Sequence, residues 1–403
     1  MLLVGIDQSQ RKHDVCLMNE VGVHLARFEI SHNARGFQRL HGERQRIEVS
    51  PRDCLVALES GYSLLVDYLL DQHYQVHIIP GKAVDRYRDR HRQSCSASDR
   101  SDAVVLAHIL RTDRHLYTPW YADQPLTRQI CSLVKLVHDL KHSVVQFTNR
   151  LRNLLWRYYP LAAELFSDLN LPISLHFIQT YPAPQQAKQL TKAQFAAFCR
   201  DHRYYRSDLI ARRYGQLLNA QTFASSYVAA AYASQAQTLA RVTLDLVQER
   251  DQAQKQLTQA FAQHPDSFIF EPLPGAGEFL APALLSKFRD CRARFPTAAV
   301  AQAIAGTSPV TIQSGKRRRV QFRRACDKDF RYYATQFAKC STQESAWAAA
   351  YFDTVRPRCE KASHAYRCLA NRWLAIIWRL WTNRVEYDEA VHLRNRHTGR
   401  RPH

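Results

Sequence analysis

Several common patterns are absent from this chain. No apolar run approaches the roughly 18 residues that a membrane-spanning helix needs. The first residues, MLLVGIDQSQ, lack the basic-then-apolar order of a secretory signal. None of the 10 cysteines forms a CxxC pair, so neither a zinc site nor a disulfide framework is expected. These absences favour a cytoplasmic protein with reduced thiols and without a membrane partner.

Acidic residues are scarce relative to basic ones. The chain has 56 Lys and Arg against 36 Asp and Glu, which gives a formal net charge of +20. Such an excess favours a nucleic-acid partner, because cationic side chains neutralise phosphates and release counterions. With 403 residues, of which 46% are hydrophobic, the chain is long enough for two or three domains with substantial cores.

The first part of the chain alternates between strand and helix patterns. Three short apolar or alternating runs predict an antiparallel meander, and a β-α-β-α pattern follows it. The sequence therefore predicts an α/β domain over residues 1–120, with helices on the faces of a mixed sheet. The expected strands are 2–7, 12–19, 23–31, 54–58 and 75–80, and the expected helices are 33–46, 64–72, 81–91 and 99–111.

A helical stalk is predicted over residues 121–265. Apolar residues from Leu126 to Leu154 recur in steps of four and three, a pattern typical of a coiled-coil seam. A second stripe consists of Leu239, Val242, Leu246, Ala253 and Leu257. Such stalks commonly dimerise, so we expect a homo-oligomer, a dimer or a tetramer. The alternative is an antiparallel hairpin within one chain that has no oligomeric role.

The remainder of the chain is expected to form a mainly α C-terminal domain over 266–385. A basic, β-prone loop or hairpin interrupts its helices near residue 314. The polar, basic residues 386–403 predict a disordered tail.

Four acidic residues lie where the predicted elements would bring them together. Asp7 and Glu59 end two buried strands, and parallel pairing of those strands would place both carboxylates at one sheet edge. Asp99 and Asp102, three residues apart, share a face at the start of a helix, where negative charge is tolerated. Taken singly, Asp99 has an ordinary explanation as a helix cap and Glu59 as a surface acid.

Taken together, the four carboxylates predict a metal centre. Converging carboxylates repel one another unless cations are present. Two divalent cations about 4 Å apart are the usual arrangement for phosphodiester cleavage. We therefore expect two Mg²⁺ ions, with Mn²⁺ as an alternative. The neighbouring acids Asp14, Asp53, Asp67 and Asp85 are interpreted as solvated charge.

The segments that carry these acids resemble a known family. VGIDQSQRKHDV, VALESGYSLLVDYL and SDRSDAVVLAHIL are similar to the DEDD-type insertion-sequence transposases related to the Piv invertases. The resemblance spans nearly the whole chain and implies a RuvC-like N-terminal domain, in which Asp7, Glu59, Asp99 and Asp102 take the four metal-binding positions. It also implies a structured noncoding guide RNA that pairs with donor and target DNA.

Two C-terminal segments carry further candidates. Gly275 and Gly277 in LPGAGEF are similar to the turn of a helix-hairpin-helix motif, whose amides approach a phosphate, although a simple tight turn is the alternative. GTSPVTIQSGKRRRVQFRR resembles a second signature of the same transposases, and the family's serine nucleophile matches Ser314, with Ser308 as the rival. The basic residues expected to bind nucleic acid are Lys316, Arg317, Arg318, Arg319, Arg323 and Arg324.

The favoured interpretation is a DNA transposase and recombinase with a transient serine–DNA linkage, active in a prokaryotic cytoplasm and at the nucleoid when bound to DNA. Aromatic and basic residues mix in RNRLRNLLWRYYP and DHRYYRSDLIARRYG, which suits contact with RNA or DNA, although Trp156 and Tyr214 have an alternative role in packing the stalk ends. Two other functions stay open: a RuvC-like junction endonuclease that uses water, and a non-catalytic nucleic-acid-binding protein.

Overall fold

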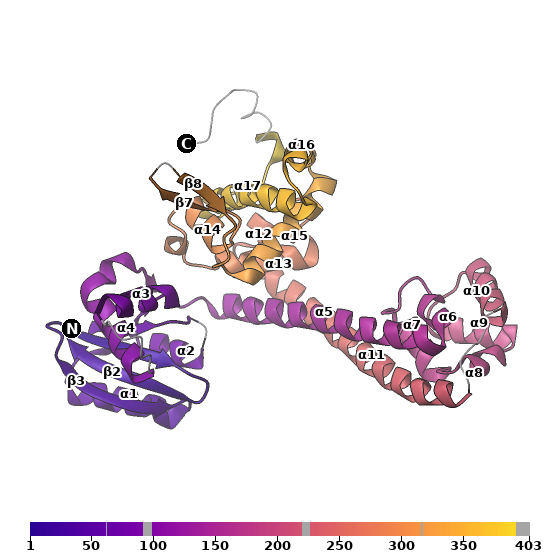
Figure 1. Ribbon diagram of the computed structural model, residues 1–403, viewed down its shortest axis with the longest axis horizontal. Helices are drawn as coiled ribbons and strands as arrows, with labels where there is room; N and C mark the ends of the chain where they lie inside the picture. Colours follow the sequence, from indigo (N-terminus) through magenta and orange to yellow (C-terminus); the bar gives the residue numbers. More distant parts are fainter. Residues whose placement is uncertain (62, 92–98, 220–225, 316, 392–403) are drawn as a thin grey trace. The chain divides into compact units, whose positions relative to one another are not determined.

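The computed structural model describes residues 1–61, 63–91, 99–219, 226–315 and 317–391 (Figure 1). These residues divide into two compact units. The first contains Met1–Gln124 and Asp290–Pro296, and the second contains Pro125–Arg289 and Thr297–His403.

A mixed sheet forms the centre of the first unit. Among the described residues it has six strands in the order β3-β2-β1-β4-β5-β6 (Figure 1). The meander β1-β2-β3 is antiparallel, whereas β1, β4 and β5 run parallel and β6 is antiparallel to β5. The predicted mixed sheet is therefore confirmed. The strands are β1 Leu2–Gln8, β2 Lys12–Asn19, β3 His24–Ser31, β4 Cys54–Leu58, β5 Gln75–Ile78 and β6 Pro119–Trp120.

The four α-helices of the first unit lie within a few residues of the ranges that the sequence predicts, and three short 3-10 helices were not predicted. Asn33 caps the first helix, because its side chain accepts a hydrogen bond of 2.9 Å from the Gly36 amide. The helices are α1 Ala34–Arg46, η1 Pro51–Asp53, α2 Leu64–Asp71, α3 Gly81–His91, α4 Asp99–Asp113, η2 Arg114–Leu116 and η3 Arg292–Arg294.

Each face of the sheet carries its own hydrophobic core, because successive strand residues point to opposite faces. This alternation is visible in β1, where Val4 and Ile6 belong to the same core as Phe37 of α1. Leu3 of the same strand packs on the other face, with Val84 of α3 and Leu106 of α4. The sheet is therefore covered on both sides, as its continuous apolar strands require.

Gly5 allows α4 to lie directly on β1. A β-carbon at this position would overlap the Ala103 carbonyl oxygen and would lie 2.6 Å from the Ala107 amide nitrogen. Both atoms belong to the backbone of α4, so neither can rotate away. The close approach brings the first turns of α4 to the strand that carries Asp7.

The second unit is mostly helical. Its helices, with the β7-β8 hairpin among them, are α5 Pro125–Tyr158, α6 Pro160–Glu164, α7 Pro172–Thr180, α8 Pro184–Lys188, α9 Lys192–Asp201, α10 Ser207–Asn219, α11 Ser226–Ala262, α12 Ser267–Phe270, α13 Gly277–Phe288, α14 Ala298–Ile304, β7 Val310–Ser314, β8 Arg317–Gln321, α15 Lys328–Glu344, α16 Ala346–Val355, η4 Arg356–Arg358 and α17 Ala362–Asn383.

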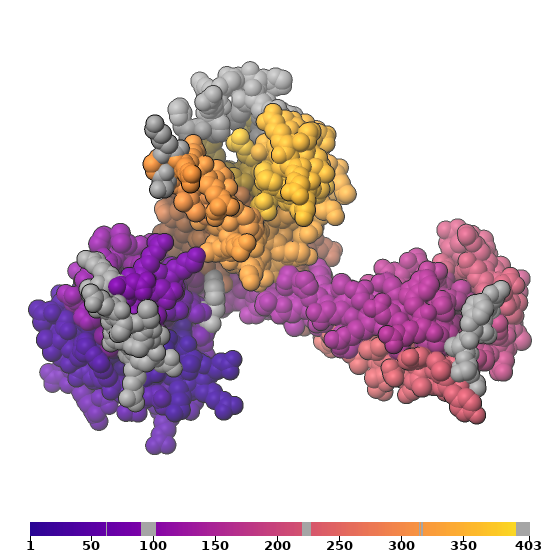
Figure 2. Space-filling model, viewed as in Figure 1, coloured from indigo at the N-terminus to yellow at the C-terminus, as the bar shows by residue number. Residues whose placement is uncertain are grey.

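The two long helices α5 and α11 form an antiparallel pair within one chain. They lie side by side in the ribbon (Figure 1) and touch in the space-filling view (Figure 2). At one end Thr127 Oγ1 lies 2.8 Å from His264 Nε2, just beyond α11, and at the other the rings of Tyr158 and Tyr232 stack 5.9 Å apart. The apolar seam of α5 is therefore buried inside the chain. This is the intramolecular hairpin that the sequence allowed, and a coiled-coil dimer along this seam stays a prediction.

The buried face of α11 agrees with the predicted stripe at Ala253 and Leu257, which are buried, but is displaced from it by one residue earlier in the helix. Leu239, Val242 and Leu246 are only partly buried. The neighbouring positions Ala240 and Leu244 are buried. The predicted stripe was wrong at Leu239, Val242 and Leu246 because it favoured large apolar residues over neighbouring positions such as Ala240.

A second core holds the C-terminal helices together. Phe288 of α13 contacts the rings of Phe330 in α15 and Trp381 in α17 at centroid distances of 5.7 and 5.3 Å. The short helix α12 and a turn at Gly275 precede α13, but the helix-hairpin-helix interpretation of this turn stays a prediction. Residues 392–403 of the predicted disordered tail lie outside the described residues. Within the described part of the chain, we found no helix that is both long and apolar enough to cross a membrane.

We predict that Gly5→Ala lowers the free energy of unfolding by about 1–3 kcal/mol, because α4 must move off β1. The measurement is chemical denaturation followed by circular dichroism. Gly42→Ala is the matched control, since a β-carbon on this α1 glycine meets nothing within 4 Å. It should stabilise the protein by about 0.5–1 kcal/mol. Equal effects of the two changes would contradict the close packing at Gly5.

Candidate active site

Asp7 and Glu59 lie at the same edge and on the same face of the sheet. In the parallel pair β1-β4, Gly5 lies opposite Ala57, and each acid follows two residues later. Leu3 and Ala57 point toward the face that α3 and α4 cover. Because side chains alternate with a period of two, Asp7 and Glu59 belong to that same face. The structure thus brings together two acids that the sequence predicts to be neighbours.

The third carboxylate comes from α4. Asp102 immediately precedes Ala103, whose carbonyl lies against Gly5 of β1. The Asp102 side chain is largely buried, with 17% of its surface exposed. Asp99 is the first residue of α4, but its side chain lies outside the described residues. The described cluster is therefore Asp7, Glu59 and Asp102.

The electrostatics of Glu59 show that other carboxylates are close to it. Its pKa is raised, first by partial burial of the carboxylate and then by the negative charges of Asp102 and Asp85, while Arg88 acts in the opposite direction. The start of α3 adds to the crowding, since a β-carbon on Gly81 would lie 3.2 Å from Glu59 Oε2. Like charges gathered in this way favour a bound cation.

Asp85 and Arg88 of α3 belong to this cluster, and the sequence interpretation missed them. Arg88 donates through Nη2 and Nε to Asp102 Oδ1, at 2.7 and 3.1 Å. Its Nη1 lies 3.4 Å from Asp85 Oδ1. The sequence interpretation treated Asp85 as solvated charge, because the sequence does not show which residues of other elements face an acid on a helix surface. The Asp-x-x-Arg spacing on one helix face was the available hint.

Gln8 connects the ends of β1 and β4. Its side-chain nitrogen donates to Ser63 Oγ at 2.9 Å, and its side-chain oxygen accepts from the Ser60 amide at 3.2 Å. Ser63 also caps α2 by accepting from the Val66 amide. This amide side chain therefore holds the loop after Glu59 against the strand that carries Asp7.

The β7-β8 hairpin carries the candidate nucleophile. Ser314 is the last residue of β7 and pairs in register with Arg317, the first residue of β8. Gly315 in the connecting turn has a φ of +54°, which suits glycine. The side chain of Ser314 and all of Lys316 lie outside the described residues. Ser308 lies before β7 and is half-buried.

The predicted nucleic-acid-binding residues divide into two groups. Arg317, Arg318, Arg319 and Arg324 are exposed. Arg323 instead donates to the backbone carbonyls of Ser308 and Pro309, at 3.2 and 3.4 Å, and so closes the base of the hairpin. A nucleic-acid contact of the exposed arginines stays a prediction.

Gly275 and Gly277 differ in their surroundings. The Gly275 amide donates to Glu344 Oε2 at 2.7 Å, and its α-carbon packs against the backbone of α15, where a β-carbon would lie 2.6 Å from the Cys340 carbonyl carbon. Gly277 begins α13, and a β-carbon there meets nothing within 4 Å. In this structure the Gly275 amide is thus directed to a carboxylate, and phosphate binding at this turn stays a prediction.

Comparison with known proteins identifies the class. A family model described as a transposase matches residues 4–160, which include the acidic cluster, and a second matches residues 268–353, which include the basic hairpin. The second model is described as the transposase IS116/IS110/IS902 family. The class is therefore that of the DEDD transposases.

Individual relatives agree with this class. The chain is 31% identical over 398 residues to the mini-circle putative transposase for IS117 of Streptomyces coelicolor, covering 96% of this chain and 95% of that protein. It is 28% identical to the putative transposase y4uE of Sinorhizobium fredii over 51% of this chain and 57% of that one. It is 25% identical to the insertion element IS900 42 kDa protein of Mycobacterium paratuberculosis over 82% of each chain. The chain belongs to the IS110 family of transposases, which confirms the resemblance.

We predict that Arg88→Gln makes stability depend on divalent cations, because the carboxylates lose their nearest counter-charge. In the presence of a chelator the free energy of unfolding should fall by about 1–3 kcal/mol, the range for hydrogen bonds to charged groups. Excess Mg²⁺ should restore most of that loss. The control Arg46→Gln removes an exposed pair with Glu43 and should behave alike with and without Mg²⁺. A loss in Arg88→Gln that Mg²⁺ does not reverse would count against a cation site here.

Proposed function

We propose that this transposase excises and inserts its element by metal-dependent strand cleavage and exchange, with Ser314 as the nucleophile. The observation that carries the proposal is positional: Asp7 and Glu59 follow paired positions of β1 and β4, and α4 brings Asp102 to the same face of the sheet, where its charge acts on Glu59. Their oxygen-only donor set suits Mg²⁺, or alternatively Mn²⁺. The raised pKa of Glu59, caused by burial and then by neighbouring carboxylates, also fits a site that receives positive charge.

The residues that would hold two cations are Asp7, Glu59, Asp99 and Asp102. When bound, such ions activate an oxygen nucleophile and stabilise the leaving oxygen of a phosphodiester. Asp7 and Glu59 stay in place through the strand pairing and the Gln8 link. Asp102 is paired with Arg88, and this ion pair would break when Asp102 binds a cation. Arg88 would then keep its pair with Asp85 and could also pair with a DNA phosphate.

The serine step follows from ordinary phosphoryl transfer. The Ser314 oxygen forms a bond to a DNA phosphorus as the bond from phosphorus to a deoxyribose oxygen breaks, and the proton given up by the serine balances the proton that the leaving oxygen takes up as a hydroxyl. Attack by another DNA hydroxyl on the serine phosphodiester would rejoin a strand and release the serine. Arg317, Arg318 and Arg319 follow closely in the chain and supply positive charge for the phosphate and its transition state.

DNA, donor and target, is the proposed substrate, and a structured noncoding RNA is the proposed guide. The chain supports this with exposed aromatic and basic side chains on the helical region. Trp156 and Tyr205 are 52% and 70% exposed, and Arg157 and Arg206 beside them are exposed as well. Exposed aromatic rings stack on bases, and arginines neutralise the phosphates. Tyr214, by contrast, donates to the Leu190 carbonyl and packs in the core. A homo-oligomer remains part of the proposal, although the α5-α11 seam does not argue for one.

We predict that Asp7→Asn abolishes recombination between donor and target DNA, because one charged ligand of the metal centre is lost. Binding of DNA or RNA, measured by gel shift, should change less than about threefold, since phosphate contacts rest on basic residues. Asp53→Asn, an exposed acid in η1, is the control and should recombine like the wild type. Recombination by Asp7→Asn at the wild-type rate would exclude the metal-dependent mechanism.

We predict that Ser314→Ala eliminates a covalent protein–DNA adduct and strand exchange together. End-labelled DNA incubated with Mg²⁺ and resolved on a denaturing protein gel measures the adduct. Ser308→Ala is the matched control and should keep it, because Ser308 lies outside the hairpin turn. Strand nicking without an adduct in the wild type would indicate water as the nucleophile, as in a junction endonuclease. Absence of both nicking and adducts under all conditions would indicate a non-catalytic protein.

A further inference from the structure

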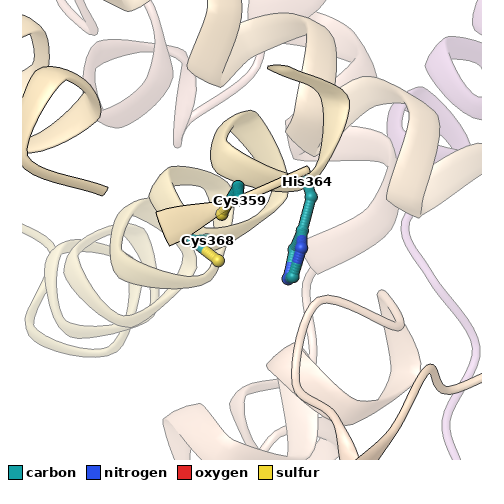
Figure 3. Close-up of side chains that lie close together, drawn as sticks. All are labelled: Cys359, His364 and Cys368. Carbon is teal, nitrogen blue, oxygen red and sulfur yellow. The ribbon is translucent and has the colours of Figure 1, made fainter. Parts of the chain in front are cut away.

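Three metal-ligand side chains of the second unit meet near the start of α17. The ligand atoms of Cys359, His364 and Cys368 all lie within 4.8 Å of one another (Figure 3). Cys359 is buried, Cys368 is half-buried and His364 is exposed. None of the three belongs to the acidic cluster or to the β7-β8 hairpin.

The local fold explains how these side chains converge. His364 and Cys368 lie four residues apart on α17, so they share one face of the helix. Cys359 ends the η4 turn, where its amide donates to the Arg356 carbonyl and its carbonyl accepts from Arg356 Nη1 at 2.8 Å. The turn thus holds Cys359 against the first turns of α17. One of these hydrogen bonds joins two backbone groups, and the other is donated by the Arg356 side chain.

We propose that Cys359, His364 and Cys368 bind one zinc ion. Two thiolates and an imidazole form a soft donor set that selects zinc over Mg²⁺. Zn–S distances of about 2.3 Å and Zn–N distances of about 2.0 Å place tetrahedral ligand atoms roughly 3.5 Å apart. The three ligand atoms already lie within 4.8 Å of one another, and rotation of the exposed His364 ring can shorten its distances to the sulfurs. Three protein ligands leave the fourth position to water or to another donor.

The site links the C-terminal helices to the basic hairpin. Arg367, next to Cys368, lies over the Phe322 ring with its Cζ 4.5 Å from the centroid. Arg331 of α15 lies over the same ring at 4.7 Å and donates to the Arg323 carbonyl. Phe322 directly follows β8. An ion that fixes the start of α17 would therefore also steady Arg367 and the base of the hairpin.

The sequence pattern gave no hint of this site, because zinc motifs usually contain a CxxC pair. Here the spacing is Cys-x4-His-x3-Cys, and the two cysteines are nine residues apart. Only the η4 turn and the helix periodicity of α17 bring the sulfurs together. The expectation that zinc is absent rested on spacing alone.

The test is zinc content of the purified full-length protein, kept reduced and in excess Mg²⁺ so that the acidic cluster does not take up zinc. We expect about one zinc per chain by mass spectrometry of the metal, and with Co²⁺ in its place a thiolate-to-cobalt charge-transfer band. Cys359→Ser and Cys368→Ser should lose both signals. Cys340→Ser, a half-buried cysteine of α15, is the control and should keep them.

His364→Ala keeps the test decisive if either cysteine variant fails to fold, because this side chain is exposed. It should weaken zinc binding by at least about tenfold, since even outer-shell changes have effects of that size. A strong zinc chelator should lower the Tm of the wild type more than that of His364→Ala. The proposal is overturned if reduced wild type holds no more zinc than Cys359→Ser, if the Co²⁺ form lacks the charge-transfer band, or if Cys340→Ser behaves like the ligand variants.

Discussion

The packing of α4 on β1 is the contact on which the candidate active site depends. Gly5 has no side chain, so the α4 backbone reaches the strand at Ala103 and Ala107. That contact sets Asp102 beside the sheet edge where Asp7 and Glu59 follow their strands. The resulting repulsion between carboxylates has to be balanced, and in this structure Arg88 supplies the balancing charge. The close packing of α4 on β1 therefore creates the need for the charge that Arg88 supplies.

A similar use of small residues organises the second unit. Alanines at positions such as 236 and 240 of α11 are fully buried, and small side chains at buried positions allow helices to pack closely. The heptad pattern of α5 is satisfied by this internal contact, so it supplies no argument for self-association. The pair also contacts helices from both parts of this unit, because α5 packs against α6 and against α13 of the C-terminal core.

The C-terminal core presents basic residues in two distinct ways. Arg323 and Arg331 are engaged in backbone hydrogen bonds and ring contacts around the hairpin base. Arg317, Arg318 and Arg319 on β8 are exposed to solvent. A run of arginines in the sequence thus separates into residues that build the hairpin and residues available to a phosphate. The proposed zinc site lies near the first group, because Arg367, next to Cys368, contacts the same Phe322 ring as Arg331.

Much of the fold was determined by the sequence itself. Alternation along β1 and β2, the Asn33 cap and the apolar periods of α4 and α5 are local properties, so strands and helices were predicted within a few residues. The family was also readable from its motifs, and the metal site predicted at Asp7, Glu59 and Asp102 rests on their positions at the ends of predictable elements. Tertiary structure alone decided which residues meet. Asp85 and Arg88 lie beside the acids, and the Gly275 amide donates to Glu344. The apolar seam of α5 packs against α11, and Cys359 lies next to Cys368. Each of these contacts depends on how segments far apart in the sequence pack together, and local sequence patterns do not determine that packing.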